Sequence, residues 1–226
     1  MDYLLSHPVC GILTSVACFG VGVLVRRALP SPFTSPLVIA NILVILIIVF
    51  TPLTLEQYEA GGNIIIMFMV PVTVILALRI YRRRAALMAN IIPITLGCAA
   101  GSAASLFSTW GLCRLLGVDG EAAASLLPKS VTTAIALELA EKNGGIAGIA
   151  APAVIITGIF SAVFSPFMIK ALRLGDPVAA GVAMGASGHA IGTAAALELG
   201  ETEGAMSGIA IGLMGIITSL IFVIVF

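Results

Sequence analysis

Charged residues are scarce in this 226-residue sequence. Only 10% of the residues are Asp, Glu, Lys or Arg, whereas 60% are hydrophobic, and the mean hydropathy is +1.17. A soluble domain has about 25% charged residues, because its surface faces water. One globular core cannot hide this much apolar surface, so much of it must face lipid. The scarcity of charge therefore excludes an ordinary soluble domain.

The chain also lacks an excess of either charge and any cluster of metal-ligating residues. Its 11 basic and 11 acidic residues balance to a formal net charge of +0, which leaves no electrostatic footprint for nucleic acid. The cysteines stand singly in apolar stretches, as small buried hydrophobes do. They are Cys10, Cys18, Cys98 and Cys113. We therefore expect no nucleic-acid partner, no metal and no cofactor.

Long apolar runs are what the sequence has instead. Helices satisfy their own backbone polar groups in lipid, and continuous rather than alternating runs exclude a transmembrane β-barrel. We predict an all-α integral membrane protein, multi-pass in the inner (plasma) membrane. The first run lacks a basic n-region and a convincing cleavage site, so we expect it to be retained. About six full transmembrane helices are expected at residues 8–26, 35–51, 62–81, 86–112, 146–171 and 204–226.

Two further stretches, 120–142 and 177–200, are apolar but interrupted by polar residues and rich in Gly, Ala, Ser and Thr. We predict that they are interrupted elements, either re-entrant hairpins or broken helices that cross the membrane. The arginines from Arg26 to Arg84 place their face in the cytoplasm. Leaving out Lys129, eight basic residues lie on that face and two on the other with hairpins, against seven and three for full crossings. This count favours hairpins only slightly.

A direct repeat relates the two interrupted stretches. Residues 130–150 align without gaps with residues 190–210 at an offset of 60, and 11 of 21 positions are identical. The matches that a bias toward alanine does not explain are Thr133 with Thr193, Glu138 with Glu198 and Glu141 with Glu201. We predict a two-fold internal repeat, with repeat 1 at about 120–171 and repeat 2 at about 177–226. If the interrupted stretches are hairpins the copies are inverted, as in many secondary transporters; if they cross, the copies are parallel.

Each interrupted stretch contains a break made of turn and capping residues. Pro128 and Ser130 predict the first break, with Ser130 as the N-cap of a half-helix. Residues 185–189 predict the second break, with Ser187 or Gly188 as the cap. A helix N-terminus offers free N–H groups and a positive dipole end. Two such ends that meet in a dry site suit a carboxylate or a phosphate.

A lysine and a histidine at the two breaks are the main candidates for chemistry. A lysine at membrane depth costs about 2.5–3.5 kcal/mol on insertion scales. Lys129 is therefore either the fixed cation for an anionic solute, or it snorkels to an interface or pairs with Glu138 or Glu141. His189 either couples a proton to the solute, since imidazole titrates near pH ~6.5, or donates to a backbone carbonyl and stabilises the break.

The other candidates are hydroxyl, glycine and acidic residues around the breaks. Hydroxyls in membrane helices either bind solute oxygens or pack helices together. Glutamates near the half-helix ends either face a solvated vestibule or an ion pair, or carry protons. The predicted substrate-binding residues are Pro128, Lys129, Ser130, Thr132, Thr133, Ser187, Gly188, His189, Gly192 and Thr193. The candidates for proton coupling are His189, Glu138 and Glu198.

Two strings in the chain resemble the LrgB/CidB family of bacterial membrane proteins. One runs from Ser125 to Ala136 and contains Pro-Lys-Ser-Val-Thr-Thr, and the other is Gly-His-Ala-Ile-Gly-Thr-Ala from Gly188 to Ala194. Both strings are specific, and the resemblance covers nearly the whole chain. One departure is Ala134, where the family commonly has proline, which implies a less rigid start of the half-helix.

The resemblance implies two different functions. The bacterial family is named for holin/antiholin-like control of murein hydrolases, often beside a smaller LrgA/CidA-type membrane partner. A plant relative is a plastidial glycolate/glycerate translocator, and bacterial relatives are linked to pyruvate transport. Lys129 between two half-helix starts favours a secondary transporter that holds a small monocarboxylate between the broken elements near the midplane. The alternative is a holin/antiholin-like pore or regulator of murein hydrolase activity and cell lysis.

An intramembrane enzyme is a third hypothesis, because residues 185–188 match the GxSG string of rhomboid-type serine proteases. A nucleophile needs its base within hydrogen-bond reach in a defined orientation. Ser187 and His189 are only two residues apart, which places them on different faces of a helix that contains both. We therefore expect no enzymatic activity.

The chain is expected to divide into two functional parts. Residues 1–116 are predicted to be scaffold or oligomerisation helices, and residues 117–226 a transport-type repeat domain. The expected partners are the lipid bilayer, a small anionic solute, a second copy of the chain in a homodimer and a smaller LrgA/CidA-type membrane protein.

Overall fold

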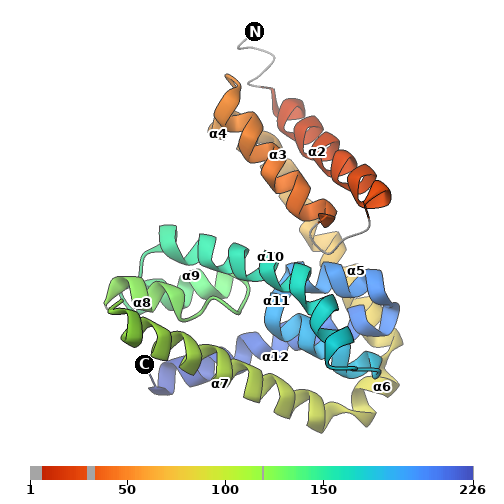
Figure 1. Cartoon of the computed structure of the whole chain (residues 1–226), viewed down its shortest axis with the longest axis vertical. Coiled ribbons are helices and arrows are strands. Elements are labelled where there is room, and N and C mark those ends of the chain that lie inside the picture. Colours follow the sequence, from red (N-terminus) through yellow and green to blue (C-terminus); the bar gives the residue numbers. More distant parts are fainter. Residues whose placement is uncertain (1–6, 30–33, 119, 226) are drawn as a thin grey trace. The chain divides into compact units, whose positions relative to one another are not determined.

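The computed structural model describes residues 7–29, 34–118 and 120–225, and within these ranges it is helical without strands (Figure 1). The chain forms two compact units, residues 1–77 and 78–226. The first unit contains α2 (Pro8–Ala28), α3 (Pro36–Phe50), α4 (Leu55–Met67) and most of α5 (Met69–Arg82). The second contains α6 (Arg84–Ala89), α7 (Ile91–Leu116), α8 (Glu121–Leu126), α9 (Thr133–Lys142), α10 (Ala147–Ala171), α11 (Pro177–Leu199) and α12 (Glu201–Val225).

Four of the helices are long and apolar enough to cross a membrane. They are α2, α7, α10 and α12, with 21 to 26 residues each. At about 1.5 Å per residue, the shortest of them spans about 31 Å, the thickness of the hydrocarbon layer. Helix α3 is apolar but has only 15 residues. The chain is therefore a multi-pass helical membrane protein.

Two of the six predicted spans are wrong in their bounds. The stretch 62–81 is not one helix, because α4 ends at Met67 and α5 begins at Met69. The predicted span 86–112 begins instead at Ile91, after the short helix α6. Both breaks, at Phe68 and Asn90, stand three residues before a proline, Pro71 and Pro93 respectively. A proline lacks the N–H that the carbonyl four residues earlier would accept, so the helix is interrupted there.

Glycines bring α2 and α4 into backbone contact in the first unit. A Cβ added at Gly11 would overlap the carbonyl oxygen of Tyr58, and one at Gly61 would overlap that of Pro8. The hydroxyls of Ser15 and Tyr58 lie 2.8 Å apart across the same contact. Small residues that allow backbones to approach are the usual means of packing helices in lipid.

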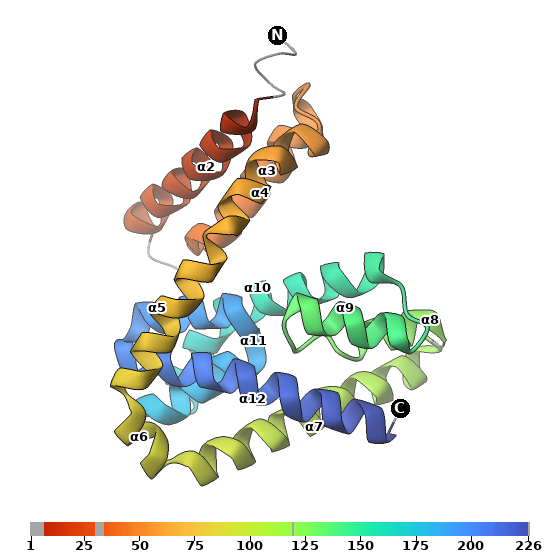
Figure 2. The ribbon, with the colours of Figure 1, turned by 180° about the vertical axis from the view of Figure 1, so that it is seen from behind.

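In the second unit, α7 and α12 pack side by side, and α11 lies against α12 and α10 (Figure 2). Buried apolar side chains from α7, α11 and α12 form the main core, which contains Ile94, Cys98, Val182, Ala205, Met206, Ala210 and Met214. The division between units at residue 77 differs from the sequence-based boundary at residue 116. The reason is that α7 shares its buried face with α11 and α12.

Helix α11 folds back on itself at His189. This residue has φ 40° and ψ −134°, far from helical values. A Cβ at Gly192 would overlap the carbonyl oxygen of Met184, eight residues earlier. In a straight helix these residues would lie about 12 Å apart. The two halves of α11 therefore run in opposite directions.

The ends of both interrupted elements return to the side from which they start. Glu203, just after the end of α11, lies beside Gly181 near its start, where a Cβ would come within 2.4 Å of the Glu203 carbonyl oxygen. Asn143, at the end of α9, lines a small cavity with Arg114 and Gly120, which flank the entry to α8. The sequence left open whether these elements return or cross, and in this structure both return.

Candidate functional site

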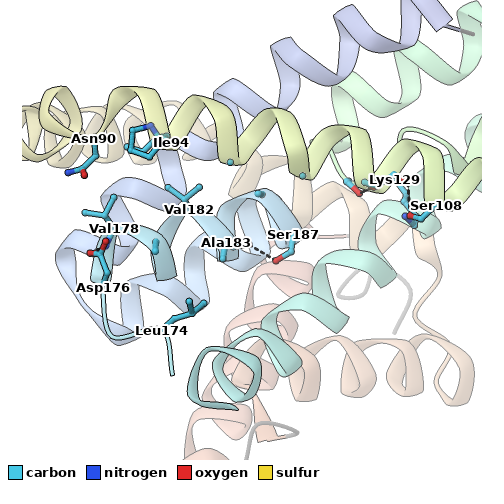
Figure 3. Close-up of a pocket in the computed structure, with 17 residues that line it drawn as sticks. Asn90, Ile94, Ser108, Lys129, Leu174, Asp176, Val178, Val182, Ala183 and Ser187 are labelled. Carbon is cyan, nitrogen blue, oxygen red and sulfur yellow. Dashed lines mark hydrogen bonds between the residues drawn. The ribbon is translucent and has the colours of Figure 1, made fainter. Parts of the chain in front are cut away.

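A cavity in the second unit lies between α7, the first half of α11 and the turn that joins α8 to α9. Its volume is about 690 Å³. The residues that line it are Asn90, Pro93, Ile94, Gly97, Gly101, Ser105, Ser108, Lys129, Ser130, Leu174, Asp176, Val178, Ala179, Val182, Ala183, Ala186 and Ser187. Most of these side chains are small or apolar. Asn90 and Asp176 lie at one end, Lys129 and Ser108 at the other, and Ser187 lies between them (Figure 3).

One face of α7 forms a wall of the cavity. Its lining residues recur every three or four positions from Asn90 to Ser108, which is the spacing of one helix face. Gly97 and Gly101 have no side chain to fill the space. Ser105 and Ser108 then add hydroxyls near the far end, so the wall changes from apolar to polar along the helix.

Lys129 provides the positive charge at this polar end. Its Nζ donates a hydrogen bond of 2.7 Å to Oγ1 of Thr109, on α7. Among the residues that the structure describes, no carboxylate lies within ion-pair distance of this ammonium. A single neutral hydroxyl leaves most of the hydrogen-bonding capacity of an ammonium unused. Lys129 is thus partly buried beside a cavity, without a fixed counter-charge in the described part of the chain.

Ser130 fixes the turn that carries Lys129. Its hydroxyl is hydrogen-bonded to that of Ser105, on α7. Pro128 and Val131 are almost fully buried on either side of these two residues. The turn is therefore held against α7 by packing as well as by hydrogen bonds.

The opposite end of the cavity is acidic. Asp176 lies there with Asn90 and Val178 (Figure 3). Its side chain accepts a hydrogen bond of 3.0 Å from the backbone N–H of Val178 and so caps α11. A carboxylate at a helix N-terminus is stabilised by the helix dipole. The cavity thus has a cation at one end and a capping carboxylate at the other.

Ser187 joins a group of hydroxyls between α10 and α11. Its Oγ donates to the carbonyl oxygen of Ala183 at 2.8 Å and lies 2.7 Å from Oγ of Ser161 and 3.4 Å from Oγ of Ser165. Ser187 is part of the first half of α11 and is not its N-cap. The break occurs two residues later, so the prediction of a cap at Ser187 or Gly188 is wrong.

His189 is buried and does not line the cavity. Its Nε2 lies 3.0 Å from the carbonyl oxygen of Val154, on α10. The imidazole rests on Gly158, where a Cβ would come within 2.6 Å of Cε1. This contact matches the structural role that the sequence offered for His189. At the repeat offset of 60, His189 is the counterpart of Lys129.

The other predicted site residues lie near the two breaks but outside the cavity. Thr193 Oγ1 donates to the carbonyl oxygen of His189 at 3.1 Å and lies 2.7 Å from Oγ of Ser207. The predicted N-cap Ser130 is wrong, because Thr132 precedes the first residue of α9, Thr133. The residues of the predicted set that do not line the cavity are Pro128, Thr132, Thr133, Gly188, His189, Gly192 and Thr193.

The glutamates proposed for proton coupling are exposed and lie away from the cavity. Glu138 accepts a hydrogen bond of 2.7 Å from Lys142, one helical turn later. This ammonium holds the pKa of the Glu138 carboxyl below its usual value. Glu198 is also exposed. Within the described ranges, no three His, Cys, Asp or Glu residues gather to hold a metal ion.

Sequence reasoning missed the contribution of α7 to this site. Thr109 bonds to Lys129, Ser105 bonds to Ser130 and Ser108 lines the cavity, yet all three fall in a span that was assigned to the scaffold. The signal was present in the sequence as glycines at positions 97 and 101, followed by hydroxyls on the same helix face.

Comparisons with known proteins match almost the whole chain. The model of the LrgB-like family matches residues 15–226. The chain is 33% identical over 215 residues to the antiholin-like protein LrgB of Bacillus mycoides strain KBAB4, which covers 95% of this chain and 94% of that protein. The proteins of the same name from Bacillus cereus strains B4264 and AH187 match to the same extent. No solved structure matches the chain.

Proposed function

Because the chain belongs to the LrgB-like family, we propose that it acts as an antiholin-like membrane protein, as the names of its relatives indicate. The family resemblance implies that such a protein regulates murein hydrolase activity and cell lysis. The observation that carries the proposal is the identity of 33% across 95% of the chain. A smaller LrgA/CidA-type membrane partner and a homodimer belong to the same proposal.

An autolysis assay tests this function. The chain is expressed in a Bacillus cereus strain that lacks its LrgB relative, and detergent-induced lysis is followed by optical density. We expect slower lysis than in the strain with an empty vector. Equal lysis rates, with the protein present in the membrane at normal levels, would contradict the proposal.

The second candidate function is secondary transport of small monocarboxylates such as glycolate, glycerate or pyruvate. The observation that favours it is the cavity of about 690 Å³ with Lys129 at its polar end. Two elements that turn back, related by an offset of 60 residues, also suit the inverted repeats of secondary transporters. On this proposal, residues 120–171 and 177–226 each insert one re-entrant hairpin and one span, beside further spans in the first half of the chain.

Lys129→Ala separates the two functions. Removal of a charge-assisted hydrogen bond to the solute should lower uptake of labelled glycolate or pyruvate into proteoliposomes by about ten- to hundredfold at low solute concentration. Lys142→Ala is the matched control, because Lys142 is exposed and does not line the cavity. The antiholin-like function predicts normal lysis control by Lys129→Ala, since it needs no solute. Unchanged saturable uptake in this variant would exclude Lys129 as the solute-binding cation.

A further inference from the structure

A second cavity borders the C-terminal part of α7, on a different face of the helix from the first. Its volume is about 360 Å³, and Trp110, Cys113 and Arg114 form its wall on α7. Leu127, Asn143 and Phe222 close it from the α8–α9 turn, the end of α9 and α12. The guanidinium of Arg114 lies over the indole ring of Trp110, 5.5 Å from its centre. This cavity therefore also contains a cation.

Neighbours in the chain line the two cavities, and the layer between these residues contains the contact of Lys129 with Thr109. On α7 the first cavity ends at Ser108 and the second begins at Trp110. The residue between them, Thr109, is the one that accepts the hydrogen bond of Lys129. On the other side of the layer, Lys129 lines the first cavity and Leu127 lines the second.

We propose that the two cavities are the two halves of one pathway for small anions, closed by the contact between Lys129 and Thr109. The hydroxyl of Thr109 occupies the position that an anionic oxygen would take at the ammonium. A carboxylate or phosphate oxygen binds an ammonium more strongly than a neutral hydroxyl does. An arriving anion therefore replaces Thr109, and this replacement opens the layer toward Arg114.

The charges along the pathway fit this order of events. Lys129 and Arg114 lie on the two sides of the layer, at the inner end of the first cavity and in the second cavity. Asp176 lies at the far end of the first cavity, beside Asn90. The 18 positions from Asn90 to Ser108 correspond to about 27 Å of helix, so its carboxylate is well separated from Lys129.

His189, the counterpart of Lys129 in the second repeat, takes no part in the layer between the cavities. His189 is buried, its ring lies on Gly158, and its Nε2 lies 3.0 Å from the carbonyl oxygen of Val154. It lines neither cavity. The layer between the cavities is thus formed by the first repeat together with α7.

Thiol labelling from each face of the membrane tests the pathway without any transport measurement. Cys113 lines the second cavity, and the other cysteines line neither cavity. In a background with Cys10→Ser, Cys18→Ser and Cys98→Ser, Cys113 is reacted with a membrane-impermeant methanethiosulfonate in vesicles of either orientation. We expect reaction only from the face at the C-terminal end of α7.

Substitutions that break the contact between Lys129 and Thr109, called barrier variants here, should make Cys113 reactive from the opposite face as well. Thr109→Val keeps the side-chain shape but removes the acceptor of Lys129, and we expect at least about tenfold faster reaction through the first cavity. Lys129→Ala should have the same effect, and Lys142→Ala should have none. Thr109→Val keeps the test valid even if Lys129→Ala does not fold.

Added anions provide the second measurement. Glycolate or inorganic phosphate should accelerate the reaction of Cys113 from the first-cavity face in the chain that retains Lys129, but not in Lys129→Ala. The two anions distinguish carboxylate from phosphate as the preferred ligand. One-sided reaction in every barrier variant, or acceleration that does not depend on Lys129, would overturn the pathway. Failure of glycolate or pyruvate uptake alone would contradict only the transport function, on which the identity of the solute rests.

Discussion

His189 combines a strained backbone with a buried hydrogen bond. Its φ of 40° and ψ of −134° lie in a region that is populated almost only by glycine. The histidine nevertheless occupies this position with its imidazole 3.0 Å from the carbonyl oxygen of Val154. The side chain thus contributes a contact that offsets part of the strain at the turn of α11.

Two substitutions of His189 should separate the strain from the hydrogen bond. His189→Ala keeps the strain and loses the bond, whereas His189→Gly loses both. We therefore expect the glycine variant to be more stable than the alanine variant by about 1–3 kcal/mol, with the wild type above the alanine variant. Thermal unfolding in detergent, followed by circular dichroism, measures the difference. Equal stability of the two variants would show that the turn is not strained.

The sequence indicated where Lys129 lies in the site, but not which partners the nearby serine hydroxyls bond to. The string around Lys129 identified one end of the cavity, because a lysine in an apolar stretch needs a polar environment. The capping roles predicted for Ser130 and Ser187 are wrong, because each hydroxyl is hydrogen-bonded to a neighbouring helix instead. The partner of each hydroxyl depends on how closely α7 and α10 approach, and the local sequence does not show this.

At the scale of helices, the packing of α2 against α4 can be tested with two neighbouring glycines of α4. Gly61 and Gly62 are neighbours on α4, but only Gly61 faces α2, where a Cβ would overlap the carbonyl oxygen of Pro8. Nothing lies within 4 Å of a Cβ at Gly62. Gly61→Ala must separate two backbones and should cost about 1–3 kcal/mol. Gly62→Ala should be neutral or stabilising by up to about 1 kcal/mol.

Retention of the monodisperse peak on gel filtration after graded heating compares these two variants. If both keep the stability of the unsubstituted chain, the α2–α4 contact is looser than described. The prediction belongs to the first unit alone, so the second unit is expected to unfold unchanged in both variants.

The sequence predicted some properties of the two interrupted elements but not others. Proline, glycine and serine predicted a break in each element, and matched threonine and glutamate residues after the breaks indicated that the two elements are related in sequence. The direction of the elements was not predicted, because a broken helix and a hairpin share the same local residues. The close approach of Gly192 to Met184 decides it, and this contact forms only after the halves of α11 pack together.

For the whole molecule, the return of both elements gives a prediction of topology. Cysteines introduced at Val118 and Asn143, on either side of α8 and α9, should react with impermeant reagents from one common face. Cysteines at Gly175 and Thr202, on either side of α11, should react together from the other face. Reaction of Val118→Cys and Asn143→Cys from opposite faces would show that the first element crosses the membrane.

The division of the chain at residue 77 also concerns the whole molecule. Sequence reasoning assigned residues 1–116, which include α7, to a scaffold. In the structure α7 packs with the repeat and lines both cavities. A repeat identifies which segments are related in sequence, whereas membership of a compact unit depends on which buried faces meet.

The position of Trp110 gives the protein an optical signal of its own. It is the single tryptophan of the chain, lines the second cavity and carries Arg114 over its ring. Its emission is therefore sensitive to whatever draws the guanidinium away from the indole. An anion that reaches Arg114 should shift the fluorescence of the unlabelled protein, and a stopped-flow trace of that shift would time the opening of the barrier.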